Sequence, residues 1–117
     1  MTAQPLLFIQ GAGDMWEPEG SGFLARYLEK SLGPDYDVIA PQMPDAATDP
    51  HYIPWRDRMD AELRGLAGPV VLVGHSLGGS LLLKYLAEGP PPVSIPPPNS
   101  PRISVTSVQT PWLPTRN

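Results

Sequence analysis

The stretch at positions 70–79 reads VVLVGHSLGG, and it decides the fold class of this chain. Four apolar, mostly β-branched residues are typical of a strand that is buried on both faces. The next five positions match Gly-x-Ser-x-Gly, a pattern that places a serine on a sharp turn between a strand and a helix. Small residues at Gly74 and Gly78 let that strand and helix approach closely. We therefore predict that Ser76 is presented at the end of a buried strand.

The other predicted elements alternate in the same way along the chain. Strands are predicted near 6–10, 36–40 and 70–73, and helices near 23–32, 55–66 and 80–88. Strands and helices that alternate at this length imply a parallel sheet with right-handed crossovers and helices on both faces. The predicted fold class is α/β, with three layers in the order α/β/α.

The composition changes after Glu88. All twelve acidic residues lie at or before Glu88, whereas segment 89–117 holds nine of the seventeen prolines. Such a segment buries too little apolar surface to offset the entropy lost on ordering. We predict a partial domain over 1–88 and an irregular, disordered Pro-rich tail over 89–117, in which the stretch 103–108 has strand-forming residues able to pair with an exposed sheet edge. Two further hypotheses are that this tail is a frameshift product and that it docks an SH3 or WW domain.

Charge and composition exclude several classes of protein. Eight basic against twelve acidic residues give a net charge of -4, which offers no basic surface to nucleic acid or an anionic membrane. The absence of cysteine excludes disulfides, thiolate metal sites and a cysteine nucleophile. No apolar run approaches the roughly 20 residues of a membrane helix. We expect a cytoplasmic protein with no metal, no cofactor, and no nucleic-acid or membrane partner.

A glycine-rich loop, Gly11-Ala12-Gly13, follows the first predicted strand. In folds with this serine turn, a backbone N–H from such a loop and the N–H after the serine stabilise a developing oxyanion. We predict Ala12 and Leu77 as these two donors. The residues predicted to border the substrate are Gly11, Gly13, Trp16 and His75.

Two phosphate-binding patterns are excluded by single positions. Trp16 stands where the third glycine of the dinucleotide fingerprint would be. No lysine follows the glycines of 74–79, as a P-loop requires.

These motifs resemble the small single-domain α/β-hydrolases of the YdeN and retinoblastoma-binding protein 9 type. The resemblance covers about residues 5–88 and rests on Gly11, Gly13, Trp16, Gln42-Met43-Pro44-Asp45, Trp55, the turn at 74–78 and the helix residues 83–88. It implies the N-terminal half of an α/β-hydrolase fold, with hydrolysis of a small carboxylic ester by acyl transfer to Ser76. Gln10 departs from the family, because many relatives carry histidine there.

The resemblance also implies an acid and then a histidine after the serine. The chain contains only His51 and His75, and no acidic residue follows Glu88. Because a serine near its free pKa is a poor nucleophile, we expect this truncated chain to be inactive. The alternative is a non-catalytic pseudo-hydrolase fragment that binds a ligand or partner, and self-association through the exposed sheet edge is a further expectation. Thioesterase, acyltransferase and peroxidase-like chemistries use the same turn and stay open.

Overall fold

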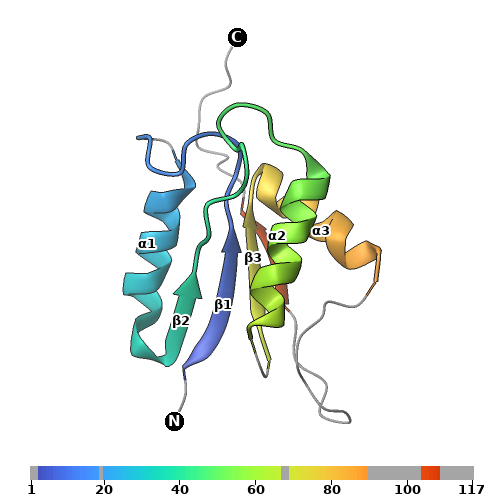
Figure 1. The fold of residues 1–117 in the computed structure, drawn as a ribbon. Coiled ribbons are helices and arrows are strands. Elements are labelled where there is room, and N and C mark those ends of the chain that lie inside the picture. The colour runs from blue at the N-terminus through green and yellow to red at the C-terminus, as the bar shows by residue number, and fades with distance from the viewer. Residues whose placement is uncertain (1–2, 19, 67–68, 90–103, 109–117) are drawn as a thin grey trace.

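The computed structural model describes residues 3–18, 20–66, 69–89 and 104–108 (Figure 1). Strands and helices alternate through these ranges, and this confirms the predicted α/β class. The elements are β1 (Gln4–Ile9), α1 (Ser21–Leu32), the short 3-10 turn η1 (Gly33–Asp35), β2 (Tyr36–Ile39), α2 (Tyr52–Arg64), β3 (Val71–His75), α3 (Leu77–Ala87) and β4 (Ser104–Val108).

The strands form one parallel sheet in the order β2-β1-β3-β4. Leu7 at the centre of β1 lies opposite Ile39 of β2 on one side and Leu72 of β3 on the other. Because all strands run the same way, the loops that follow β1, β2 and β3 gather at one end of the sheet, the upper end in Figure 1. In open parallel sheets ligands bind at this carboxyl end.

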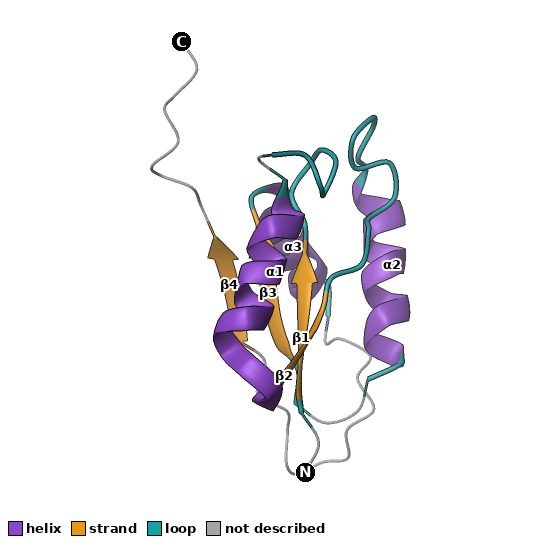
Figure 2. Ribbon diagram, turned by 90° about the vertical axis from the view of Figure 1, so that its left-hand side faces the viewer, coloured by secondary structure: helices purple, strands orange, loops and turns teal. Residues whose placement is uncertain are grey.

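Helices cover both faces of the sheet, so the three-layer prediction is confirmed (Figure 2). Leu7 and Ile9 of β1 pack with Trp55 of α2 and Leu82 of α3. Their neighbours Leu6 and Phe8 point to the opposite face and pack with Ala25 of α1. A strand buried on both faces needs an unbroken apolar run, and this explains the sequence of β1.

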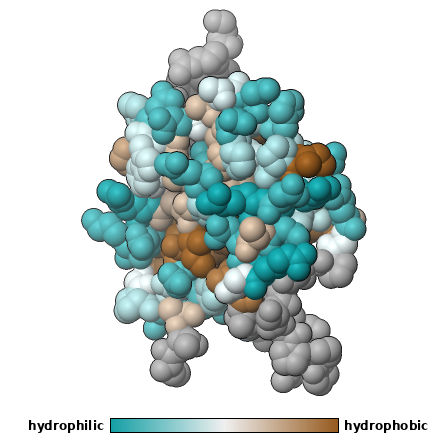
Figure 3. All heavy atoms as spheres, in the orientation of Figure 1, coloured by the Kyte–Doolittle hydropathy of each residue, from teal (hydrophilic) through white to brown (hydrophobic). Residues whose placement is uncertain are grey.

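Helix α2 is amphipathic. Trp55, Met59 and Leu63 recur every fourth residue and are all fully buried. On its outer surface Arg58 pairs with Glu62 and Arg64 with Asp60, each four residues apart. The face of the molecule in Figure 3, which includes α2, is accordingly mostly hydrophilic, with apolar colour in small separate areas. None of the helices in the described ranges is long and apolar enough to cross a membrane.

Strand β4 continues the sheet beyond β3. It runs parallel to β3, from Val71 opposite Ser104 to His75 opposite Val108. This confirms the prediction that this stretch can pair with the edge that β3 would otherwise expose. The rest of the predicted tail, 90–103 and 109–117, lies outside the described residues. The domain boundary at residue 88, the frameshift and docking hypotheses and the expected self-association stay predictions.

Candidate active site

Ser76 occupies the single position between β3 and α3. Its backbone has φ 57° and ψ -123°, a positive φ that is uncommon and strained for a residue with a side chain. The carbonyl of Ser76 accepts hydrogen bonds from the N–H of Gly79 at 2.9 Å and of Ser80 at 3.3 Å, which hold the turn. The residue is exposed. The turn thus places a hydroxyl-bearing residue at the surface, at the carboxyl end of a central strand.

Gly74 and Gly78 permit this turn because they have no side chain where neighbouring backbones lie very close. A Cβ atom on Gly74 would overlap the backbone of Gly79 in the first turn of α3. A Cβ atom on Gly78 would overlap the carbonyl oxygens of Ile9 and Gln10 at the end of β1. The Gly-x-Ser-x-Gly spacing is therefore a packing requirement that joins α3 to β3 and to β1.

The loop after β1 runs alongside the serine. A Cβ atom on Gly11 would lie 3.2 Å from the Cβ of Ser76 and 3.2 Å from the carbonyl oxygen of His75. Ala12 follows and is exposed. With Gly13 and Asp14 it lines an open pocket of about 390 Å³. A second pocket of about 360 Å³ lies between this loop and the loop after β2.

The backbone donors of this loop are largely engaged. The N–H of Gly11 donates to Ser21 Oγ at 2.7 Å, and the N–H of Gly13 donates to the Ala46 carbonyl at 2.7 Å. Among the described residues, the N–H of Ala12 has no acceptor. Leu77 begins α3, so its N–H has no acceptor within the helix. The two groups predicted as oxyanion donors are thus available, and their catalytic role stays a prediction.

Gln10 ties this loop to the one after β2. Its side chain is 2% exposed. Nε2 donates to the Gly13 carbonyl at 3.1 Å, and Oε1 accepts from the N–H of Met43 at 2.6 Å. In the sequence, Gln10 stands out only as a departure from relatives. This bridging role was missed, because Met43 is 33 residues away and no local pattern connects the two.

The structure gives the ring of His75 a hydrogen-bond partner other than Ser76. Its Nδ1 lies 2.8 Å from the hydroxyl of Ser21 at the start of α1. Burial lowers the pKa of His75 below its ordinary value. Ser21 is itself 4% exposed. No pattern in the sequence points to Ser21, since a serine at a helix start is common and its partner His75 is 54 positions away.

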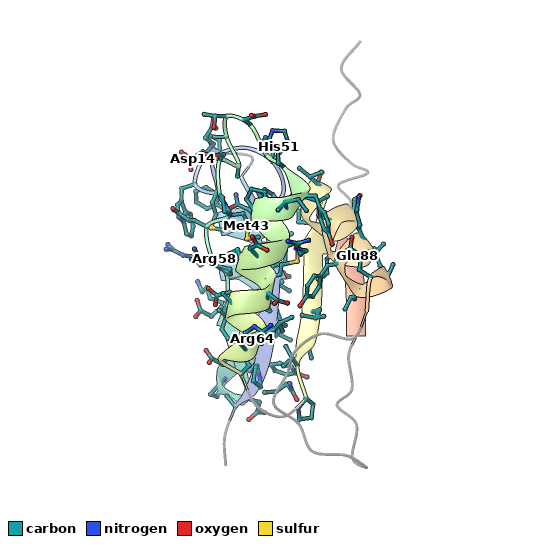
Figure 4. The ribbon with its side chains drawn as sticks, turned by 45° about the vertical axis from the view of Figure 1, so that its right-hand side comes forward. Asp14, Met43, His51, Arg58, Arg64 and Glu88 are labelled. Atoms are coloured by element: carbon teal, nitrogen blue, oxygen red, sulfur yellow. The ribbon has the colours of Figure 1, made fainter. Side chains whose placement is uncertain are left out.

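The other two side chains considered near the site have partners of their own. The ring of Trp16 is 43% exposed, lies edge-on to Phe23 with centroids 5.5 Å apart, and has the Arg26 guanidinium 4.8 Å from its centroid. The Nε2 of His51 lies 3.0 Å from a carboxylate oxygen of Asp49. Figure 4 shows Asp14 and His51 on loops at the same end of the molecule. That Trp16 borders a substrate stays a prediction.

The lowered pKa of His75 predicts how stability depends on pH. The unfolded chain takes up a proton at His75 near pH 6.5, whereas the folded chain does so only at a lower pH. The contribution of His75 to the free energy of unfolding is therefore complete above about pH 6.5 and is lost as the pH falls through the folded pKa. We expect urea midpoints to decrease from pH 7.5 to 5.5, and to decrease less in His75→Asn. Equal slopes in the two proteins would contradict this.

A family model described as "Alpha/beta hydrolase family" matches residues 6–116. No curated protein and no solved structure matches the chain. The finer assignment to the YdeN and retinoblastoma-binding protein 9 type stays a prediction. The family match spans nearly the whole sequence, and the parallel sheet with a serine between β3 and α3 agrees with it. The chain belongs to the alpha/beta hydrolase family.

Proposed function

We propose that Ser76 is the nucleophile of a carboxylic ester hydrolase of the small single-domain type that the sequence resembles. Membership of the family indicates a hydrolase-type function. The observation that carries the finer proposal is the backbone of Ser76, which has a positive φ in an exposed turn between a parallel strand and a helix. Strain of this kind persists where the surrounding structure supports it, and it concentrates at functional sites.

In the proposed reaction, Ser76 Oγ attacks the carbonyl carbon of an ester and loses its proton to a base. The carbonyl oxygen becomes an oxyanion, which the N–H groups of Ala12 and Leu77 would receive. The C–O bond to the alcohol then breaks, the alcohol leaves with a proton, and the acyl group stays on Ser76. Water hydrolyses this acyl-enzyme and restores the serine.

The base is the limiting element in this 117-residue chain. Its histidines are His51 and His75, and one ring nitrogen of each lies at hydrogen-bond distance from Asp49 and Ser21 respectively. We therefore propose that the chain on its own acylates Ser76 slowly and turns over little ester. What remains for catalysis is binding and the backbone donors, since the loss of a triad member removes several orders of magnitude of rate.

A fluorophosphonate probe with intact-mass detection and peptide mapping tests this proposal. We expect one adduct, on Ser76, that is absent in Ser76→Ala and retained in Ser80→Ala. Ser80 is also exposed and lies one helical turn further along, in α3. Added imidazole supplies a base and should speed the modification of Ser76 by about tenfold or more. Modification at equal rates in Ser76→Ala and the unaltered chain would overturn the proposal and favour a non-catalytic, ligand-binding domain.

A further inference from the structure

Ser21 joins three parts of the molecule that meet beside the serine turn. Its buried Oγ lies 2.7 Å from the backbone nitrogen of Gly11, in the loop after β1. The same oxygen lies 2.8 Å from Nδ1 of His75, the last residue of β3. These partners are 10 and 54 positions away along the chain. One hydroxyl therefore connects the start of α1 with the glycine-rich loop and with the strand that ends at Ser76.

The Ser21 hydroxyl can satisfy both partners at once. A backbone N–H can only donate, so Ser21 Oγ accepts from Gly11. A hydroxyl has a second lone pair and one proton, so the same oxygen forms its hydrogen bond to Nδ1 of His75 as donor or as acceptor, according to the tautomer of the ring. Burial lowers the pKa of His75 and favours the neutral imidazole.

This arrangement fixes the loop that carries Ala12. The backbone of Gly11 is held against the turn, close enough that a Cβ there would lie 3.2 Å from the Cβ of Ser76. Further along the loop, the Met15 carbonyl accepts a hydrogen bond from the N–H of Gly22 at 2.8 Å. The first turn of α1 thus holds the loop on both sides of Ala12. Because the Gly11 N–H already donates to Ser21, the next backbone N–H that can donate to a substrate is that of Ala12.

We propose that Ser21 is a positioning residue, which holds the β1–α1 loop at the Ser76 turn through the hydrogen bonds of its Oγ to the N–H of Gly11 and to Nδ1 of His75. Ser21 does not touch the substrate in this scheme, and it acts through the placement of the Ala12 N–H. The inference rests on the proposed function in one respect, because its effect on reaction rate requires Ser76 to be the nucleophile. The effect on the loop itself does not depend on that.

Two substitutions of His75 form a matched pair for the test. In His75→Asn the side-chain amide on Cγ takes the place of Nδ1 and can still form a hydrogen bond with the Ser21 hydroxyl, as acceptor or as donor. His75→Leu has a similar shape at Cγ but no polar atom. Ser21→Ala removes the hydroxyl altogether. Both disruptive variants should leave the Gly11 N–H exchanging with solvent at least about tenfold faster, a loss of about 1.4 kcal/mol of protection, whereas His75→Asn should stay near the unaltered chain.

The rate of fluorophosphonate modification at Ser76 is the second measurement on the same four proteins. We expect Ser21→Ala and His75→Leu to react about tenfold more slowly than the unaltered chain, and His75→Asn to react faster than His75→Leu. If the probe modifies Ser76 of the unaltered chain and all variants react at that same rate, the positioning role is wrong and the proposed function stands. If the probe does not modify Ser76 of the unaltered chain, the proposed function is wrong, and amide exchange at Gly11 still decides whether Ser21 holds the loop. Unchanged exchange in both disruptive variants would overturn the inference.

Discussion

Replacing Gly78 with alanine is expected to destabilise the fold by about 3 kcal/mol or more. The added Cβ would overlap the carbonyl oxygens of Ile9 and Gln10, which are backbone atoms and cannot rotate away. Helix α3 would have to move off β1, and the buried contacts of Leu82 with β1 would be lost with it. In a small domain whose total stability is of the order of 5 kcal/mol, this is a large fraction. Urea unfolding followed by circular dichroism measures it.

Gly65→Ala is the matched control. Gly65 ends α2 with φ -83°, and a Cβ there would lie 3.6 Å from the Glu62 carbonyl oxygen, an ordinary contact. We expect its urea midpoint to stay close to that of the unaltered chain. If Gly78→Ala and Gly65→Ala had the same midpoint, the close approach of α3 to β1 would not be a feature of the folded protein.

Trp55→Ala should lower the free energy of unfolding by about 4 kcal/mol. The Trp55 side chain projects from α2 and is fully buried, where it packs among apolar residues of β1, β3 and α3. Its Nε1 donates to the Pro44 carbonyl at 2.8 Å, so the loop after β2 is also attached to this ring. Removal of the side chain leaves a cavity and an unpaired carbonyl. Urea unfolding followed by circular dichroism gives the magnitude.

Two companion variants separate the contributions at Trp55. Trp55→Phe keeps most of the apolar volume but loses the donor to Pro44, and we expect a cost of about 1 kcal/mol. Trp16→Ala removes the same side chain from a site that is 43% exposed, where about 1 kcal/mol or less is expected. A loss at Trp16 as large as that at Trp55 would contradict the core described for this fold.

The order and type of the elements could be predicted because their signals are local. The apolar runs of β1 and β3 and the four-residue repeat of Trp55, Met59 and Leu63 are each visible within a short window. The boundaries were less predictable. Helix α2 begins at Tyr52, before the predicted Trp55, because Pro54 in the first turn has no intrahelical hydrogen bond to lose. Strand β3 continues through Gly74 because β1 offers it a partner at Ile9.

The candidate site also has a part with a local sequence signal and a part without one. The turn at Ser76 has a five-residue pattern, so its place between a strand and a helix was predictable. The contacts that surround it are long-range. Ser21 with His75, and Gln10 with Met43, meet only after the sheet has assembled, and polar residues of these types carry no pattern that names a distant partner. The position of Ser76 on the turn was therefore predictable from the sequence, and the hydrogen bonds around it were not.

The positive φ of Ser76 makes the folded state less stable in order to expose a hydroxyl. A glycine at position 76 would adopt the same backbone without strain, whereas serine raises the free energy of the folded state by on the order of 1 kcal/mol. A sequence selected only for a high free energy of unfolding would therefore favour glycine at position 76. The exposed hydroxyl of Ser76 therefore lowers the stability of the folded state, and the close backbone packing at Gly74 and Gly78 holds the turn in this conformation.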